Sequence, residues 1–290
     1  MSASPAGALV RSPGYWVAVL RRFARDPVAI GAAAVVLGLI LMAVFAPWLA
    51  PQDPLQGMTL KRLRPPGTEG HLLGTDELGR DMLSRLIHGA RISLFMGIVP
   101  VFTALLAGAA IGIVAGYAGG WTNSLLMRTM DVFFAFPSVL LAVALAGALG
   151  PGILNSIIAL TLVFVPPIAR VAESVTTGVR SRDYVEAAKA SGAGALTIIR
   201  KHVLGNVLGP IFVYAMSLIA VCMILASGLS FLGLGVKPPM PDWGLMLNTL
   251  RTAIYTQPLL CALPGVMIFI TSISFNIMTD GLRSAMDIKA

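Results

Sequence analysis

The sequence predicts an all-α integral membrane protein with six transmembrane helices. Of its 290 residues, 57% are hydrophobic and only 12% are charged, whereas soluble domains carry roughly 25% charged residues. The hydrophobic residues are also gathered in separate runs, and a run of about 20 is long enough to cross a bilayer. This composition excludes a soluble enzyme, a disordered chain and a fibrous repeat.

The first part of the chain is expected to hold a tail, a surface helix and one span. Residues 1–27 should form a cytoplasmic tail, in which the stretch from Gly14 to Arg25 mixes aromatic residues with arginines. That mixture is typical of a helix lying in the membrane interface. The first span is predicted at residues 28–49. We interpret it as a retained helix, because it is longer than the apolar core of a signal peptide.

The rest of the chain, up to residue 290, is expected to complete one transmembrane domain. Further spans are predicted at residues 93–117, 125–149, 152–169, 208–234 and 259–278. The third should be only mildly broken, at Pro137. In the second span Gly108, Gly112 and Gly116 share one helical face, a pattern that indicates close helix packing, either within the chain or between chains.

Two long polar segments separate the spans. The external loop at residues 51–91 contains Leu78, Met82 and Leu86 at helical spacing, which predicts an amphipathic helix at the outer membrane surface. The second segment, residues 170–206, is rich in alanine and is expected to form a cytoplasmic helical loop.

The orientation is predicted from the distribution of lysine and arginine. If the N-terminus is cytoplasmic, 13 of the 21 lysines and arginines lie in the inner segments. Cytoplasmic segments carry an excess of these residues, so both termini are expected inside.

The residues that would support catalysis or metal binding do not occur in suitable patterns. Cys222 and Cys261 lie within apolar runs, and the three histidines lie in separate polar segments, so no metal or haem site is expected. No phosphate-binding Gly-Lys-Ser/Thr loop is present. The one acid that could serve an ion relay, Asp131, is expected to pair with Arg128 one helical turn away. Energy for any transport should therefore arrive from another subunit, with no catalytic, cofactor or metal residues on this chain.

Four motifs occur in a specific order. They are GTDELGRDMLSRLIHGARISL at 74–94, MDVFFAFPSVLLA at 130–142, YVEAAKASGA at 184–193 and LSFLGLGVKPPMPDWGLML at 229–247. Together they resemble the permease subunits of peptide-type ATP-binding-cassette importers. The length and motif of the first external loop are similar to those of the C-type member of the permease pair.

The resemblance implies the type I importer fold in the inner membrane of a bacterium. It implies three kinds of protein partner besides the lipid bilayer: a second, B-type permease chain, two ATPase subunits that carry ATP and Mg, and an extracytoplasmic solute-binding protein. Nucleic acid is not among them. The implied cargo is dipeptides or oligopeptides, and nickel chelates, glutathione and other peptide-like solutes are alternatives within the family. An ion-gradient-driven secondary transporter is a more distant alternative, because the spans contain few charged residues. Proton- or sodium-dependent flux by the lone chain would establish it.

The resemblance also assigns an ATPase-coupling helix to the cytoplasmic loop. Its residues are Asp183, Tyr184, Glu186, Ala187, Ala188 and Gly192. Ser181 or Asp183 is expected to cap the start of this helix, and Gly192 is expected to end it. An ordinary surface helix is the alternative. Relatives have proline where this chain has Gly205. The resemblance therefore does not determine the geometry of the bend that follows the coupling helix.

Two further groups of residues are candidates for function. Possible docking residues for the binding protein are Asp76, Glu77, Arg80 and Asp81, for which a purely structural role is the alternative. Possible pathway residues are Asn155, Ser156, Ser272, Ser274 and Asn276. Each of these could instead form an interhelical hydrogen bond, which contributes about 0.6 kcal/mol.

Overall fold

The structure, a computed structural model, describes residues 15–286. The first 14 residues of the predicted tail and the last four of the chain lie outside the described part. Within it the secondary structure is helical, apart from three isolated bridges in the loop between residues 57 and 81. The prediction of an all-α protein is confirmed.

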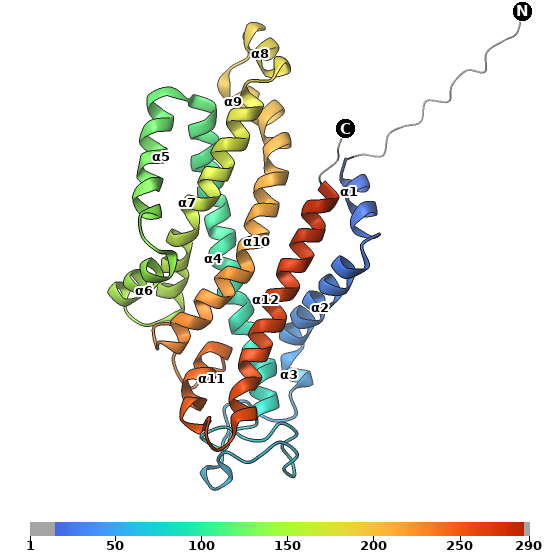
Figure 1. Ribbon diagram of the computed structural model, residues 1–290, viewed down its shortest axis with the longest axis vertical. Helices are drawn as coiled ribbons and strands as arrows, with labels where there is room; N and C mark the ends of the chain where they lie inside the picture. The colour runs from blue at the N-terminus through green and yellow to red at the C-terminus, as the bar shows by residue number, and fades with distance from the viewer. Residues whose placement is uncertain (1–14, 287–290) are drawn as a thin grey trace, which may run out of the picture.

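The helices form an elongated bundle (Figure 1). They are α1 (Tyr15–Phe23), α2 (Pro27–Val44), α3 (Ala46–Leu49), α4 (Met82–Ala118), α5 (Gly120–Phe134), α6 (Ser138–Leu149), α7 (Ile153–Arg180), α8 (Asp183–Ala190), α9 (Ala195–Ile198), α10 (Leu204–Phe231), α11 (Trp243–Leu250) and α12 (Pro258–Met286). A π-helical turn, Ile199–Val203, joins α9 to α10. Short 3₁₀ turns occur at Thr59–Lys61 and Arg251–Ala253.

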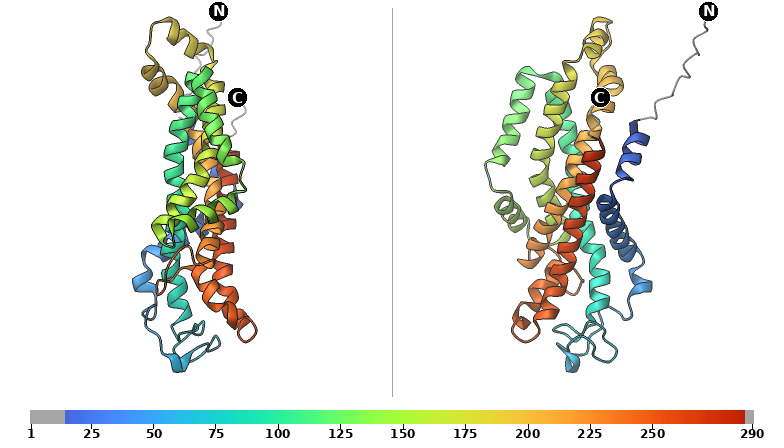
Figure 2. Two further views of the ribbon diagram at one scale, coloured as in Figure 1. Left: turned by 90° about the vertical axis from the view of Figure 1, so that its left-hand side faces the viewer. Right: turned by 45° about the vertical axis from the view of Figure 1, so that its right-hand side comes forward.

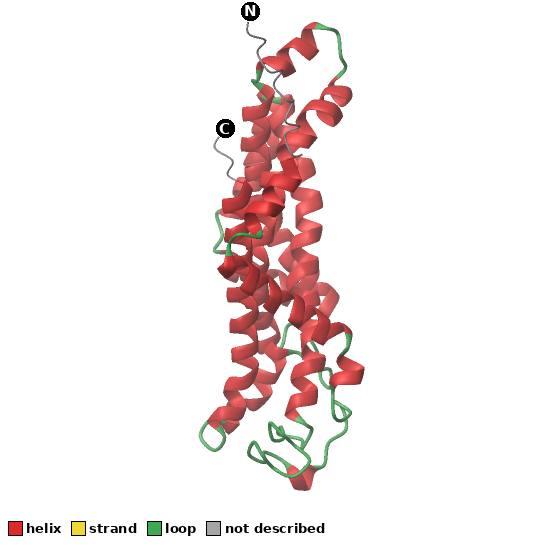
Figure 3. Ribbon diagram, turned by 90° about the vertical axis from the view of Figure 1, so that its right-hand side faces the viewer, coloured by secondary structure: helices red, strands yellow, loops and turns green. Residues whose placement is uncertain are grey.

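The two ends of the bundle differ in character. Helix α8 projects at one end, next to α9, and α1 and the last turns of α12 lie toward that same end (Figure 1). The long loop after α3, together with α11, forms the opposite end, where most of the loop structure is concentrated (Figure 3). Helices α1 and α2 pack along one side of α12, at the edge of the bundle (Figure 2).

Five described helical segments are individually long and apolar enough to cross a membrane: α2, α4, α7, α12 and the continuous helix from Ala195 to Phe231. Helices α5 and α6 supply a sixth span only if they are taken as a pair, because they are bent by 88°. The expectation of a mild break at Pro137 is therefore wrong. Proline lacks the N–H for a helical hydrogen bond and disfavours helix in the residue before it, so α5 stops and α6 starts in a new direction.

The predicted surface helix of the outer loop is instead the beginning of α4. This helix starts at Met82 rather than near residue 93. Met82 and Leu86 are buried, while Leu78 lies outside the helix and is about half exposed. The hydrophobic spacing therefore marks the face of a long helix that packs into the bundle, and a separate helix on the membrane surface does not form.

Two helices also continue beyond their apolar runs at the end that carries α8. Helix α7 ends at Arg180 rather than near residue 169, and α12 reaches Met286. Gly205 does not break the chain, because α10 runs through it. The helix is locally unwound before that point, in the π-helical turn.

The glycine stripe of α4 packs against α7. A Cβ added at Gly108, Gly112 or Gly116 would lie 2.8, 2.3 or 2.7 Å from the main-chain oxygen of Val165, Ala169 or Glu173 respectively. The close packing therefore lies within this chain, and only glycine allows the two backbones to approach so closely.

We expect Gly112→Val to lower the stability of the folded chain by about 1–3 kcal/mol or more, because the added side chain meets main-chain atoms that cannot rotate away. Thermal unfolding of the purified protein in detergent measures the change. Gly38→Val, in α2, is the matched control, since nothing lies within 4 Å of a Cβ there. Equal unfolding temperatures for the two variants would contradict this packing.

Candidate functional site

The start of the exposed helix α8 is closed by backbone hydrogen bonds rather than by a side-chain cap. Arg182 is the N-cap, with an extended backbone and no side-chain capping bond. Its carbonyl accepts from the N–H groups of Val185 and Glu186 at 2.9 and 3.2 Å. Ser181 Oγ donates instead to the carbonyl of Gly178, at 3.2 Å. The predicted cap by Ser181 or Asp183 is therefore wrong.

The end of α8 has the geometry expected for a glycine stop. Gly192 has a φ of +78°, a left-handed conformation that side chains with a Cβ rarely adopt. Its N–H donates to Lys189 O at 3.0 Å, and the N–H of Ala193 donates to Ala188 O at 3.1 Å. These two bonds satisfy the last carbonyls of the helix.

One face of α8 packs on the bundle. Val185 is fully buried and Ala188 is half-buried against the core. The ammonium of Lys189 lies 5.7 Å from the centre of the Tyr117 ring, at the end of α4. Ala188 therefore belongs to the inner face of the helix.

The opposite face of α8 is free within the described chain. Asp183, Glu186, Ala187 and Ala190 recur at spacings of three and four residues and are all exposed. Tyr184 lies at the margin, where its hydroxyl accepts from Asn206 Nδ2 at 3.3 Å. The free face thus combines two carboxylates with two small side chains, which allows a partner surface to approach the helix backbone closely.

At the opposite end, the outer loop is built around Asp76. Its Oδ1 accepts from the N–H groups of Leu78 and Arg80, both at 2.9 Å. Its Oδ2 accepts from Arg80 Nε at 2.6 Å and lies 3.1 Å from Arg85 Nε. Arg80 also pairs with Glu77 at 2.8 Å. One carboxylate therefore organises the turn before α4.

Asp81 fixes the start of α4. Its Oδ2 accepts from both the N–H and the hydroxyl of Ser84, at 2.8 and 2.7 Å, and its Oδ1 lies 3.1 Å from His71 Nδ1. The carboxylate is an N-cap, placed where the helix leaves its first N–H groups without partners.

Burial separates the four docking candidates. Asp76, Arg80 and Asp81 are at most 4% exposed, so their positions support an internal, structural role. The side chain of Glu77 is 26% exposed. Of the four, Glu77 is the most exposed, although its Oε1 pairs with Arg80 and its Oε2 is buried.

The five pathway candidates do not come together. Asn155 Nδ2 donates to the carbonyls of Leu149 and Gly150, at 2.7 and 2.9 Å. Ser156 Oγ donates to Leu234 O at 3.1 Å. These two residues thus connect the start of α7 to the end of α6 and to the segment that follows α10. The other three lie on α12, where Ser272 and Ser274 are buried and Asn276 is exposed.

An ion pair between helices was missed by the local prediction. Asp131 of α5 pairs with Arg170 of α7 rather than with Arg128. The Arg170 guanidinium also lies 4.9 Å above the ring of Phe134, a favourable cation–π position. Both charged side chains are about half exposed. The predicted pairing is wrong because the true partner is distant in sequence and becomes a neighbour only when α5 packs on α7.

The motif after α10 also has a structural role that its sequence did not reveal. Asp242 caps α11 through Leu245 N at 3.0 Å and accepts from Ser93 Oγ of α4 at 2.8 Å. Burial raises the pKa of Asp242, and its hydrogen bonds partly oppose that shift. Trp243 is fully buried, and its Nε1 donates to Leu86 O at 3.0 Å. Both residues therefore fasten α11 to α4.

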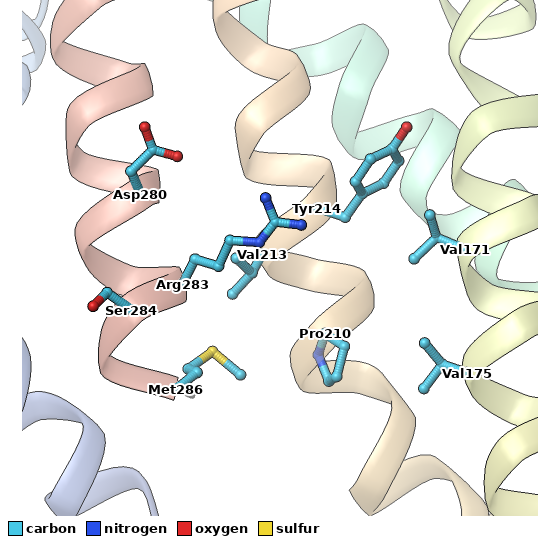
Figure 4. A pocket seen from close by; sticks show the side chains of 9 residues that line it. All are labelled: Val171, Val175, Pro210, Val213, Tyr214, Asp280, Arg283, Ser284 and Met286. Atoms are coloured by element: carbon cyan, nitrogen blue, oxygen red, sulfur yellow. The ribbon is translucent and has the colours of Figure 1, made fainter. Parts of the chain in front are cut away.

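A cavity of about 700 Å³ opens between α7, α10 and α12, close to the end that carries α8 (Figure 4). Its lining residues are Val171, Val175, Pro210, Val213, Tyr214, Asp280, Arg283, Ser284 and Met286. Among the described residues, no group of three or more histidines, cysteines and acids could hold a metal ion.

Long apolar spans that enclose a cavity, with a short helix projecting beyond them, are features of a membrane transport subunit. Residues 108–289 match the family described as the binding-protein-dependent transport system inner membrane component. Residues 14–66 match the N-terminal transmembrane domain of oligopeptide transport permease C. The chain belongs to this family of inner-membrane permease subunits of ATP-binding-cassette importers.

Curated relatives cover nearly the whole chain. The glutathione transport system permease protein GsiD of Pectobacterium atrosepticum is 40% identical over 97% of this chain and 92% of its own length. The di/tripeptide transport system permease protein DppC of Pseudomonas aeruginosa is 42% identical over 92% of this chain and 90% of its own.

A solved structure supports the fold. An inward-facing crystal form of the MetNI methionine transporter matches with a TM-score of 0.58, covering 70% of this chain and 97% of its own at 19% identity. This similarity shows the type I importer fold, and at that identity it carries no information on cargo.

Proposed function

We propose that this chain is the C-type permease subunit of an ATP-driven importer of short peptides. The observation that carries the proposal is the free face of α8, which ends the bundle with a rigid, small-residue surface suited to contact another protein. The names of the two relatives support peptide cargo. Glutathione is itself a tripeptide, so the two cargoes share one chemistry, and nickel chelates remain the alternative within the family.

The proposed complex contains a B-type permease, two ATPase subunits that hold ATP and Mg, and a solute-binding protein. The free face of α8, with Asp183, Glu186 and Ala187, would contact an ATPase. Glu77 would contact the binding protein at the other end. The half-exposed charges of Asp131 and Arg170 support a second permease chain, because charge facing lipid is costly.

The end of the bundle that carries α8 is proposed to be cytoplasmic, with both termini on that side. The excess of lysine and arginine in the segments at that end supports this orientation. A periplasm-active reporter fused after Leu60 should be active, and the same reporter fused after Ser191 should be inactive. The reverse pattern would place α8 where no ATPase could reach it.

Uptake by the reconstituted complex tests the cargo. With the binding protein and ATP, labelled Ala-Ala should enter proteoliposomes, and unlabelled glutathione should compete if it is a second cargo. The chain purified alone should neither hydrolyse ATP nor restore uptake. Uptake driven by a proton or sodium gradient without ATP would refute the proposal in favour of a secondary transporter.

A further inference from the structure

The cavity near α8 carries its charges on one wall. Asp280, Arg283 and Ser284 of α12 lie on one side of it, and the Tyr214 ring extends from α10 toward Val171 of α7 (Figure 4). The remaining lining is mostly apolar. A volume of about 700 Å³ lies within the range of small-ligand sites, which combine apolar walls with a few polar groups.

The two charged groups of this wall are not paired with each other. Asp280 and Arg283 are one helical turn apart and both exposed, yet the ion pairs found among residues 15–286 include neither. Figure 4 shows the Arg283 side chain extending toward Tyr214, away from the Asp280 carboxylate. A ligand can therefore meet each charge separately.

We propose, on the basis of the peptide-import function above, that this cavity binds the zwitterionic backbone of a short peptide on its way out of the permease. Arg283 binds the peptide carboxylate through its guanidinium fork. Asp280 accepts from the peptide ammonium. Residues spaced by three on a helix have Cβ atoms about 5–6 Å apart, and an extended dipeptide spans about 7 Å, so both termini can be bound at once.

The chemistry of the walls fits varied side chains. Val171, Val175 and Val213 present only methyl groups to the cavity, so they provide contact without hydrogen-bond selection. The charged wall thus recognises what all short peptides share, their two termini. Such a site discriminates against solutes that lack one of the two charges.

Protection of a cysteine from labelling tests the site without any transport. Ser284→Cys, in the complete importer complex, places a thiol on the charged wall. In inside-out vesicles a maleimide should label it, and Ala-Ala should slow the labelling. The native cysteines give little background, because Cys222 is buried and Cys261 lies near the start of α12, at the other end of the bundle.

Two modified peptides and matched variants separate the contacts. Ala-Ala amide and N-acetyl-Ala-Ala, each missing one charge, should each need about tenfold higher concentration for the same protection. Adding Arg283→Gln should remove the preference for the free carboxylate, and Asp280→Asn should remove the preference for the free ammonium. Arg128→Gln, an exposed arginine outside the cavity, should change neither. Thr197→Cys, an exposed position on α9, should show no protection.

The proposed site would be refuted if free and amidated peptides protected the cysteine equally, or if Arg283→Gln left the protection by Ala-Ala unchanged. Protection by inorganic phosphate as strong as that by Ala-Ala would also overturn it, in favour of a general anion site. Because the labelling needs neither ATP nor the binding protein, a failed site and a failed importer are distinguishable. ATP-driven Ala-Ala uptake without protection would refute only the site.

Discussion

Ala187→Trp is expected to reduce ATP-driven uptake at least tenfold while the chain remains folded and inserted. Ala187 lies on the exposed face of α8, so a larger side chain meets nothing in this chain. Within a docked interface it would create an overpacking penalty of about 1–3 kcal/mol, and about 1.4 kcal/mol already corresponds to a factor of ten in binding. Uptake and ATP hydrolysis of the reconstituted complex, together with co-purification of the ATPase, measure the effect.

The choice of position decides whether this experiment is informative. Ala188→Trp would clash within the chain, since Ala188 packs against its core, and any loss of transport would then have two explanations. Thr197→Trp is the matched control, because Thr197 is exposed on the neighbouring α9. If the Ala187→Trp variant transported at the normal rate with normal coupling to ATP hydrolysis, the proposed contact between α8 and the ATPase would be refuted.

Trp243→Ala is expected to destabilise the chain by about 3–5 kcal/mol. Its side chain is fully buried between α11 and α4, where large-to-small substitutions leave a cavity that the surroundings fill only in part. The substitution would also remove a hydrogen bond to Leu86 O. Gly89 leaves room for the indole, since a Cβ there would lie 2.9 Å from Trp243 Cδ1. A fall in the thermal unfolding temperature in detergent is the measurement.

A second tryptophan provides the comparison. Trp121 is 77% exposed at the start of α5, so Trp121→Ala should leave the unfolding temperature nearly unchanged. If the two variants unfolded at the same temperature, the fastening of α11 to α4 by Trp243 would contribute nothing to stability.

The sequence predicted the helices well wherever a single run of apolar residues determined them. It predicted their ends poorly, because α4, α7 and α12 continue into polar segments where other parts of the chain cover them. A proline such as Pro137 marks a break, but the size of the bend depends on what α6 packs against. Local spacing cannot supply that information.

The candidate residues show the same limit. The stop of α8 at Gly192 follows from one residue and its backbone requirements, and it was predictable. The burial of Asp76 and the pairing of Asp131 with Arg170 depend on segments distant in sequence. Charged residues in a loop are expected to be accessible to a partner protein, whereas most of these charged side chains form the interior of the loop.

The glycine-mediated packing of α4 on α7 has a mechanical consequence. Over residues 108–116 of α4 and 165–173 of α7, where the two backbones touch, the helices cannot slide or bend independently, so this packed segment behaves as one stiff beam. Helix α8 follows one end of this beam through α7 and residues 181 and 182, and α4 continues beyond the other end, past Pro100, to the Asp81 cap at the outer loop. At 1.5 Å per residue, α4 alone is about 55 Å long. A small tilt imposed at α8 therefore moves the packed segment as one body, and Pro100, where a helix can bend, sets how much of that tilt reaches the outer loop.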